Sequence, residues 1–234
     1  MAVITSKVVQ VSSLGPELLD NFADNPWETI IWACQTGNVP ETWTVGGQKS
    51  MTINGKDYAI DIIGLYHDEY ADGSGKAPIT FQMHDCYGTA YAMNSTNTNV
   101  GGWTDCAMRN THLPAILALM PSEVQAAIRE VNKLTSAGNT SSTINTTADK
   151  LFLLSEIEAF GKSDYAASGE GEMYDYYNAA NTTIKTISGS AADWYLRSPS
   201  KSYTNSFCFA ASDGTKSPYG AATLTKGVPF AFCF

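Results

Sequence analysis

The chain has 234 residues, 44% of them hydrophobic and 11% aromatic, enough for one large core or for a core with an attachment segment. Its formal charge is −9 and it has no basic run, which argues against nucleic-acid binding, because phosphates are neutralised by clustered Lys and Arg. The 24 Thr, 21 Ser and 14 Asn are typical of loop-rich or β-rich extracellular and virion surfaces.

Cysteine usage and hydropathy exclude further classes. The five cysteines are odd in number and form no C-x-x-C motif, which predicts buried free thiols and no disulfide framework or zinc site: Cys34, Cys86, Cys106, Cys208 and Cys233. No apolar run reaches the ~18 residues of a membrane span, and the N-terminus lacks a secretory signal. We therefore expect synthesis in the cytoplasm and no membrane insertion.

The N-terminal part, residues 1–45, is expected to be an attachment segment with short helices that precedes a main domain over 46–234. Residues 8–11 predict a short strand and 16–19 a brief helix. A terminal segment without a core of its own is ordered only where something holds it, so we expect intersubunit contacts here.

A longer helix is predicted over 27–35. Asn25 precedes Pro26, and Glu28 stands three residues after Asn25, which is the spacing of a capping box. Gly37 then provides the left-handed residue that ends many helices.

The next segment changes to a period of two. Asn54-Gly55 between 48–53 and 56–66 predicts a hairpin with a type I′ turn, and 79–83 predicts a further strand. Between them lies an acidic loop, 67–75. Its Asp68, Glu69 and Asp72 could ligate a hard cation, but their spacing does not fit an EF-hand, so a solvated turn is the preferred interpretation and no metal is assigned.

Short helices follow in the middle of the chain. One is expected after Gly101-Gly102-Trp103 with Thr104 as its cap, and another opens at Pro121. The polar stretch 136–147 is interpreted as a hairpin end or an exposed excursion. A buried strand at 150–154 should run into a helix over 155–160 that Gly161 ends.

Strands return at the C-terminal end, over 194–198, 206–210 and 228–234, with a turn at Asp213-Gly214. Strands at both ends with helices between them predict an α+β fold. Trp103, Phe152 and Trp194 are expected in the core, and Arg197 should pair with a buried carboxylate, with Glu156 as the first candidate.

No catalytic residue is assigned. Glu156 and Glu158 are spaced i, i+2, so on a helix they point apart and cannot flank one glycosidic bond. His84, Asp85 and Cys86 are adjacent on a strand and alternate faces. We expect a protein that is not an enzyme and has no cofactor.

The aromatic and polar display near the C-terminus is the best candidate for a binding face. Loops 200–205 and 212–221 carry Tyr203, Asn205 and Tyr219 as anchors, with Lys201 beside them. Tyrosine brings large contact area at low entropic cost, and Ser and Asn add hydrogen bonds. An ordinary polar loop that covers the core remains the alternative.

Five ordered motifs resemble a family of uncharacterised domains in phage tail and virion-surface proteins and in surface proteins of Firmicutes. They are N-V-G-G-W at 99–103, L-M-P-S-E-V-Q-A at 119–126, K-L-F-L-L-S-E-I-E at 150–158, W-Y-L-R-S-P at 194–199 and G-V-P-F-A-F at 227–232. The resemblance spans about residues 45 to 234.

The ending W-Y-L-R-S with G-V-P-F also resembles C-type-lectin-like domains of the formylglycine-generating-enzyme type, including the variable receptor-binding proteins of diversity-generating retroelements. Many relatives place an Arg before this proline, where Val228 stands here. The calcium-and-sugar motifs of animal lectins are absent, and no motif matches a catalytic cysteine. The resemblance implies a small twisted antiparallel sheet with short helices and long loops.

These expectations combine into a phage virion-surface protein, located in the virion, with a receptor-binding or adhesive face toward the bacterial host. Its partners would be other virion proteins through 1–45, further copies in a homo-oligomer, and a host surface glycan or protein. A purely structural tail, baseplate or capsid decoration subunit is the alternative, and a cell-wall glycan hydrolase is a third.

Overall fold

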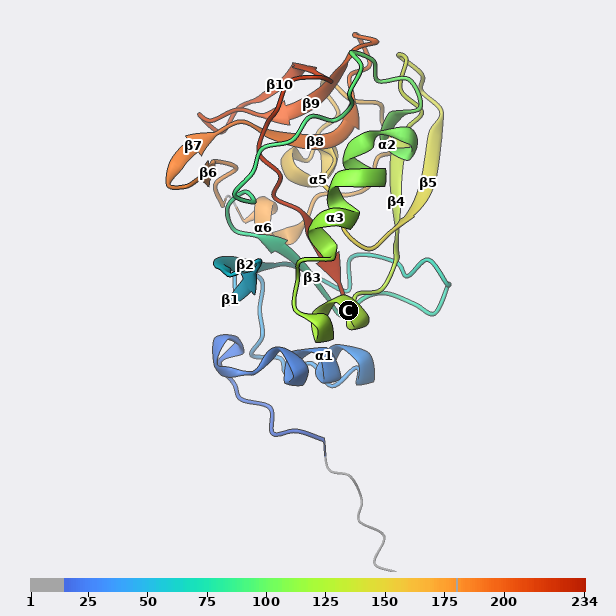
Figure 1. Ribbon diagram of the computed structural model, residues 1–234. Helices are drawn as coiled ribbons and strands as arrows, with labels where there is room; N and C mark the ends of the chain where they lie inside the picture. Colours follow the sequence, from blue (N-terminus) through green and yellow to red (C-terminus); the bar gives the residue numbers. More distant parts are fainter. Residues whose placement is uncertain (1–14, 180) are drawn as a thin grey trace, which may run out of the picture.

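The computed structural model describes residues 15–179 and 181–234, so the strand expected at 8–11 lies outside the described residues. The described chain combines short helices with small antiparallel sheets, which confirms the predicted α+β class. Figure 1 shows helix α1 at one end of the molecule and strands β8, β9 and β10 at the other.

The first sheet lies next to α1 and has the order β1-β2-β3-β11. Asn54 (φ 50°) and Gly55 (φ 75°) form the expected tight turn between β1 and β2. Strand β11 pairs with β3, so the C-terminal end of the chain is tied into this sheet. The strands are β1 (Gln48–Ile53), β2 (Lys56–Leu65), β3 (Ile79–Met83) and β11 (Ala231–Cys233).

Two local predictions near the N-terminal end are wrong. No helix forms at 16–19, and the first element among the described residues is a 3-10 turn, η1 (Phe22–Asp24). The Asn25 amide does not cap α1 (Trp27–Thr36), because it donates to Leu19 O at 3.0 Å and accepts from Leu19 N at 2.9 Å. Asn25 therefore fixes the extended chain before the helix.

The described part of 1–45 packs on the first sheet. Phe22 stacks on Phe81 of β3 with ring centroids 6.0 Å apart, and Trp27 meets Phe81 and Phe234 edge-on at 5.8 and 6.1 Å. Residues from both sides of the expected boundary at 45 thus share one apolar core. The attachment role of this segment stays a prediction.

The middle of the chain holds four helical segments and a long hairpin. Thr104 lies inside α2 and does not cap it, because the left-handed turn at Gly101 already starts the helix at Gly102. Pro121 does precede a helix, as expected. The elements are α2 (Gly102–Asp105), a π-helical turn (Met108–His112), α3 (Leu113–Leu117), α4 (Ser122–Ala127), β4 (Val131–Ser136) and β5 (Ile144–Asp149). Stretch 136–147 is the end of the β4-β5 hairpin, which confirms that interpretation.

The segment expected as a buried strand at 150–154 is buried over 151–154, with Lys150 exposed, and is not a regular strand, since only Phe152 bridges to Ala231. It leads into α5 (Glu156–Phe160), where Ser155 and Glu158 form a capping box, and Gly161 (φ 70°) ends the helix as predicted. Helix α6 (Asp175–Asn178) follows.

The second sheet has the order β10-β9-β8. Its strands are β8 (Trp194–Pro199), β9 (Ser206–Ala210) and β10 (Lys216–Ala221), and a small hairpin of β6 (Lys185–Ile187) and β7 (Ser190–Ala192) lies before it. Trp103, Phe152 and Trp194 are fully buried, and all five cysteines are free and buried, as expected.

A buried cluster of charges connects the two halves of the fold. Arg197 of β8 binds Glu158 through both terminal nitrogens, with Nη2 at 2.8 Å from Oε1. Lys133 of β4 contacts Glu158 Oε1 and Asp68 Oδ1, each at 2.7 Å. The expected pairing of Arg197 with Glu156 is therefore wrong, because the capping box directs Glu158 toward β8 and sends Glu156 the other way.

Arg197→Met should lower the free energy of unfolding by about 3–5 kcal/mol, because Glu158 keeps a buried charge without its main partner. Adding Glu158→Gln should recover a large part of that loss, since the amide is neutral and can still accept from Ser155 N. Urea denaturation of both single variants and of the double variant measures the coupling free energy between Arg197 and Glu158. If the two losses of unfolding free energy simply add, the pairing is contradicted.

Candidate binding surface

Two tyrosines from different loops meet at the end of the second sheet. Tyr203 follows β8 and Tyr219 lies on β10, and their ring centroids are 5.0 Å apart at an angle of 54°. The two hydroxyl groups are 3.4 Å apart, and this contact raises the pKa of Tyr203. Tyr203 is 38% exposed and Tyr219 63% exposed. The two rings form one amphipathic patch, here called the tyrosine patch.

A β-bulge explains why Tyr219 projects from the sheet. Ser217 pairs with Phe209 and Gly220 with Phe207, so β10 has one more residue than β9 between these pairs. The extra residue bends a strand and redirects its side chains. Gly220 is required here, because a Cβ would lie 2.8 Å from the Tyr195 ring and 2.6 Å from Phe207 O.

Lys201 and Asn205, the other two predicted site residues, flank Tyr203 in sequence but face different partners. The Lys201 ammonium is exposed and donates to Ser163 O at 2.9 Å. Asn205 is half-buried, and its Oδ1 accepts from the Ser206 hydroxyl at 3.1 Å. The structure thus brings Tyr203 and Tyr219 together and leaves Lys201 and Asn205 as neighbours of the pair along the chain.

A depression of about 350 Å³ lies beside Lys201. Three loops line it, and hydroxyl groups and small side chains predominate: Thr140, Ser141, Ser142, Ser163, Ala166, Ala167 and Ser168. Such a lining offers hydrogen-bond donors and acceptors to a polar ligand. The composition of the loops indicated polar surfaces, but the sequence did not show that these loops meet.

Asn99 holds these loops together and was not predicted as a site residue. Its buried amide donates to Tyr203 O and Ser206 O, both at 2.7 Å, and accepts from Asn139 N at 2.9 Å. It therefore joins the Tyr203 loop to the tip of the β4-β5 hairpin. The only signal in the sequence was its place before Gly101-Gly102-Trp103.

Glu170 anchors the loop between α5 and α6 from the inside. It accepts from Ser136 N at 2.8 Å and from the Ser198 hydroxyl, and its backbone carbonyl accepts from Arg197. Burial raises the pKa of Glu170 to about 7, although these donors act in the opposite direction. The loop that supplies Ser163 and Ser168 to the depression thus depends on a carboxyl group with a near-neutral pKa.

Four of the carboxylates considered for metal or acid chemistry have protein partners. Asp68 pairs with Lys133 and Asp72 with Arg129. Glu156 accepts from Ala166 N at 2.6 Å and binds Lys216 at 3.0 Å, while Glu158 binds Arg197. Within the described residues, no group of three or more His, Cys, Asp or Glu side chains could hold a metal ion.

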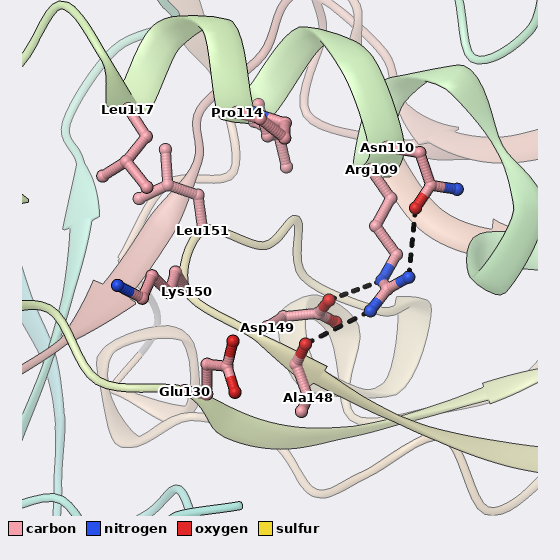
Figure 2. A pocket seen from close by; sticks show the side chains of 10 residues that line it. Arg109, Asn110, Pro114, Leu117, Glu130, Ala148, Asp149, Lys150 and Leu151 are labelled. Carbon is pink, nitrogen blue, oxygen red and sulfur yellow. Dashed lines mark hydrogen bonds and ion pairs between the residues drawn. The ribbon is translucent and has the colours of Figure 1, made fainter.

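A second depression, of about 280 Å³, lies between α3 and the β4-β5 hairpin. Figure 2 shows an apolar side with Pro114, Leu117 and Leu151 and a polar side where Arg109 binds Asp149. Arg109 Nε is 2.5 Å from Asp149, whose other oxygen accepts from Trp103 and Thr147. This ion pair fixes the π-helical turn against the hairpin, so its polar groups are already used within the protein.

Fold and surface together define a small α+β domain that displays polar and aromatic loops from a rigid sheet. Residues 79–234 match a family described as a domain of unknown function, DUF6273, and the chain belongs to this family. No curated protein and no solved structure matches the chain. No helix among the described residues is long and apolar enough to cross a membrane.

Asn99→Ala should lower the free energy of unfolding by about 2 kcal/mol, because the Tyr203 and Ser206 carbonyls and the Asn139 N–H each lose a hydrogen bond. Amide hydrogen exchange should become faster at the Asn139 N–H, because this group donates to Asn99 Oδ1. Asn145→Ala on β5 is the matched control and should leave Asn139 protected. Unchanged exchange at Asn139 in the Asn99 variant would contradict the tethering role.

Glu170→Gln tests the raised pKa of Glu170. The folded pKa of about 7 lies above the ordinary 4.5, so the carboxyl contributes stability that is complete below pH 4.5 and is lost as the pH rises through 7. As the pH rises from 4.5 to 7, the free energy of unfolding of the wild type should fall by on the order of 3 kcal/mol relative to that of the Gln variant. Denaturation curves at several pH values measure the difference, and a pH-independent difference would contradict a raised pKa.

Proposed function

We propose that this protein is a non-enzymatic phage virion-surface protein whose tyrosine patch binds a glycan or protein on the bacterial host. The proposal includes a C-type-lectin-like domain of the formylglycine-generating-enzyme type, expected from the W-Y-L-R-S and G-V-P-F motifs. In such domains the variable binding positions cluster near the C-terminal end of the chain, and Tyr203 and Tyr219 occupy this region.

The observation that carries the proposal is the meeting of Tyr203 and Tyr219. Buried aromatic rings are expected of a core, but these two rings remain accessible while they contact each other. Tyrosine is enriched in binding surfaces because a rigid ring with a polar end gives contact area and hydrogen bonding together. The hydroxyl-lined depression beside Lys201 adds polar groups to the same set of loops.

The arrangement of the molecule supports the same proposal. The second sheet, which carries the patch, and α1, which belongs to segment 1–45, lie at opposite ends of the molecule (Figure 1). A subunit held by its N-terminal segment would direct the tyrosine patch outward. Homo-oligomerisation and contacts with other virion proteins through 1–45 belong to this proposal.

The combined variant Tyr203→Ala, Asn205→Ala, Tyr219→Ala should abolish binding of labelled protein to host cells, with a nearly unchanged melting temperature, because the removed aromatic groups are exposed. Flow cytometry measures the binding. Tyr66→Ala removes another exposed tyrosine near the first sheet and is the matched control.

Two results would contradict the proposal. Undiminished cell binding by the triple variant would exclude the tyrosine patch. Failure of the triple variant to assemble into particles, with no binding of the free wild type to cells, would favour the purely structural virion subunit.

A further inference from the structure

We propose that Lys133 and Asp68 form an intramolecular amide bond, with Glu158 as the group that transfers the protons. Lys133 Nζ lies 2.7 Å from Asp68 Oδ1 and 2.7 Å from Glu158 Oε1. The three side chains are only 2–3% exposed. An amine held against a carboxyl group in a fixed, nearly dry position meets the geometric requirement for amide formation.

Two aromatic rings pack around the Lys133 side chain. Its Nζ lies 4.3 Å from the centre of the Phe152 ring and 5.5 Å from that of Tyr174. Attack on Asp68 requires the ammonium to give up a proton, and Glu158 Oε1, 2.7 Å from Nζ, lies in position to take it. A neutral lysine amine is a nucleophile, whereas an ammonium group is not.

Asp68 is the carboxyl group arranged to be attacked. Its Oδ2 accepts from the Thr80 hydroxyl at 2.5 Å and from the Tyr174 hydroxyl at 2.8 Å, and these donors would stabilise the negative charge that develops on this oxygen. Its Oδ1 faces Lys133 and is the oxygen that leaves. Glu158 is held in place by both Arg197 nitrogens and by Ser155 N, which fixes its Oε1 beside Lys133 Nζ as the proton acceptor.

The reaction is balanced without any additional reactant. A bond forms between Lys133 Nζ and Asp68 Cγ, and the bond from Cγ to Oδ1 breaks. Of the three ammonium protons, two leave with Oδ1 as water and one stays on the amide nitrogen. Glu158 relays these two protons from Nζ to Oδ1 one after the other, so it ends in its starting state. Nothing is oxidised or reduced.

The product also fits the charge balance of the core. Before the reaction, two buried cations (Lys133, Arg197) face two buried anions (Asp68, Glu158). After it, one ion pair is left, that of Arg197 with Glu158, and its net charge is zero. Two buried charges with a large desolvation cost become one neutral amide. Asp68, Lys133 and Glu158 line a cavity of about 430 Å³, which can receive the released water.

The bond would join residues 65 positions apart. Asp68 lies in the loop between β2 and β3 of the first sheet, and Lys133 lies on β4. The link would therefore fasten this loop covalently to the β4-β5 hairpin.

Intact-mass spectrometry of the denatured, reduced full chain tests the proposal. The measured mass should be lower than the sequence mass by one water, about 18 Da. Trypsin should release a branched species in which 57–76 is joined to 130–150, because the acylated Lys133 is no longer cleaved. A mass equal to the sequence mass would overturn the proposal, and so would a link from Lys133 to a peptide other than 57–76.

Variants then assign the roles. Lys133→Arg should restore the full sequence mass, and Glu158→Gln should leave most of the chain unlinked. Lys185→Arg is the matched control, because Lys185 is another buried lysine but donates to the carbonyls of Met83 and His84. It should keep the mass deficit. A deficit that persists in Lys133→Arg would place the link elsewhere and overturn the assignment.

Discussion

The buried cluster of Asp68, Lys133, Glu158 and Arg197 holds distant segments of the fold in one arrangement. It joins the loop after β2, strand β4, helix α5 and strand β8, which are far apart in the sequence. Each charge is balanced by a partner from another element, so the cluster tolerates only one relative placement of these elements. Buried ion pairs of this kind specify an arrangement more than they add net stability.

The loops of the candidate surface are fixed in a related way, by buried polar groups that reach out from the core. Asn99 binds the backbone of the Tyr203 loop and of the hairpin tip, and Glu156 binds the backbone at 165–166. Few apolar side chains are available in these Ser- and Thr-rich loops to hold them by packing. Hydrogen bonds from ordered, buried side chains supply the rigidity that a binding surface requires.

Local chemistry made part of the fold predictable. Asn54-Gly55 specifies its turn by backbone conformation alone, and Ser155 with Glu158 specifies the start of α5 by capping. Predictions failed where a side chain could serve more than one partner. Asn25 has the spacing of a cap, but its amide binds the backbone of Leu19, and Glu158 rather than Glu156 meets Arg197.

Turn residues and apolar periodicity act over a few positions, so they were enough to predict the α+β class, the hairpin at 48–66, the strands at 194–198 and 206–210 and the burial of Trp103, Phe152 and Trp194. The strand expected at 228–234 forms only over Ala231–Cys233. The folded chain was needed to see that Tyr203 meets Tyr219, that Asn99 tethers two loops and that Lys133 lies between two carboxylates. These contacts depend on the β10 bulge and on the packing of β4 beside β8, and no short-range pattern encodes distances between segments so far apart in the chain.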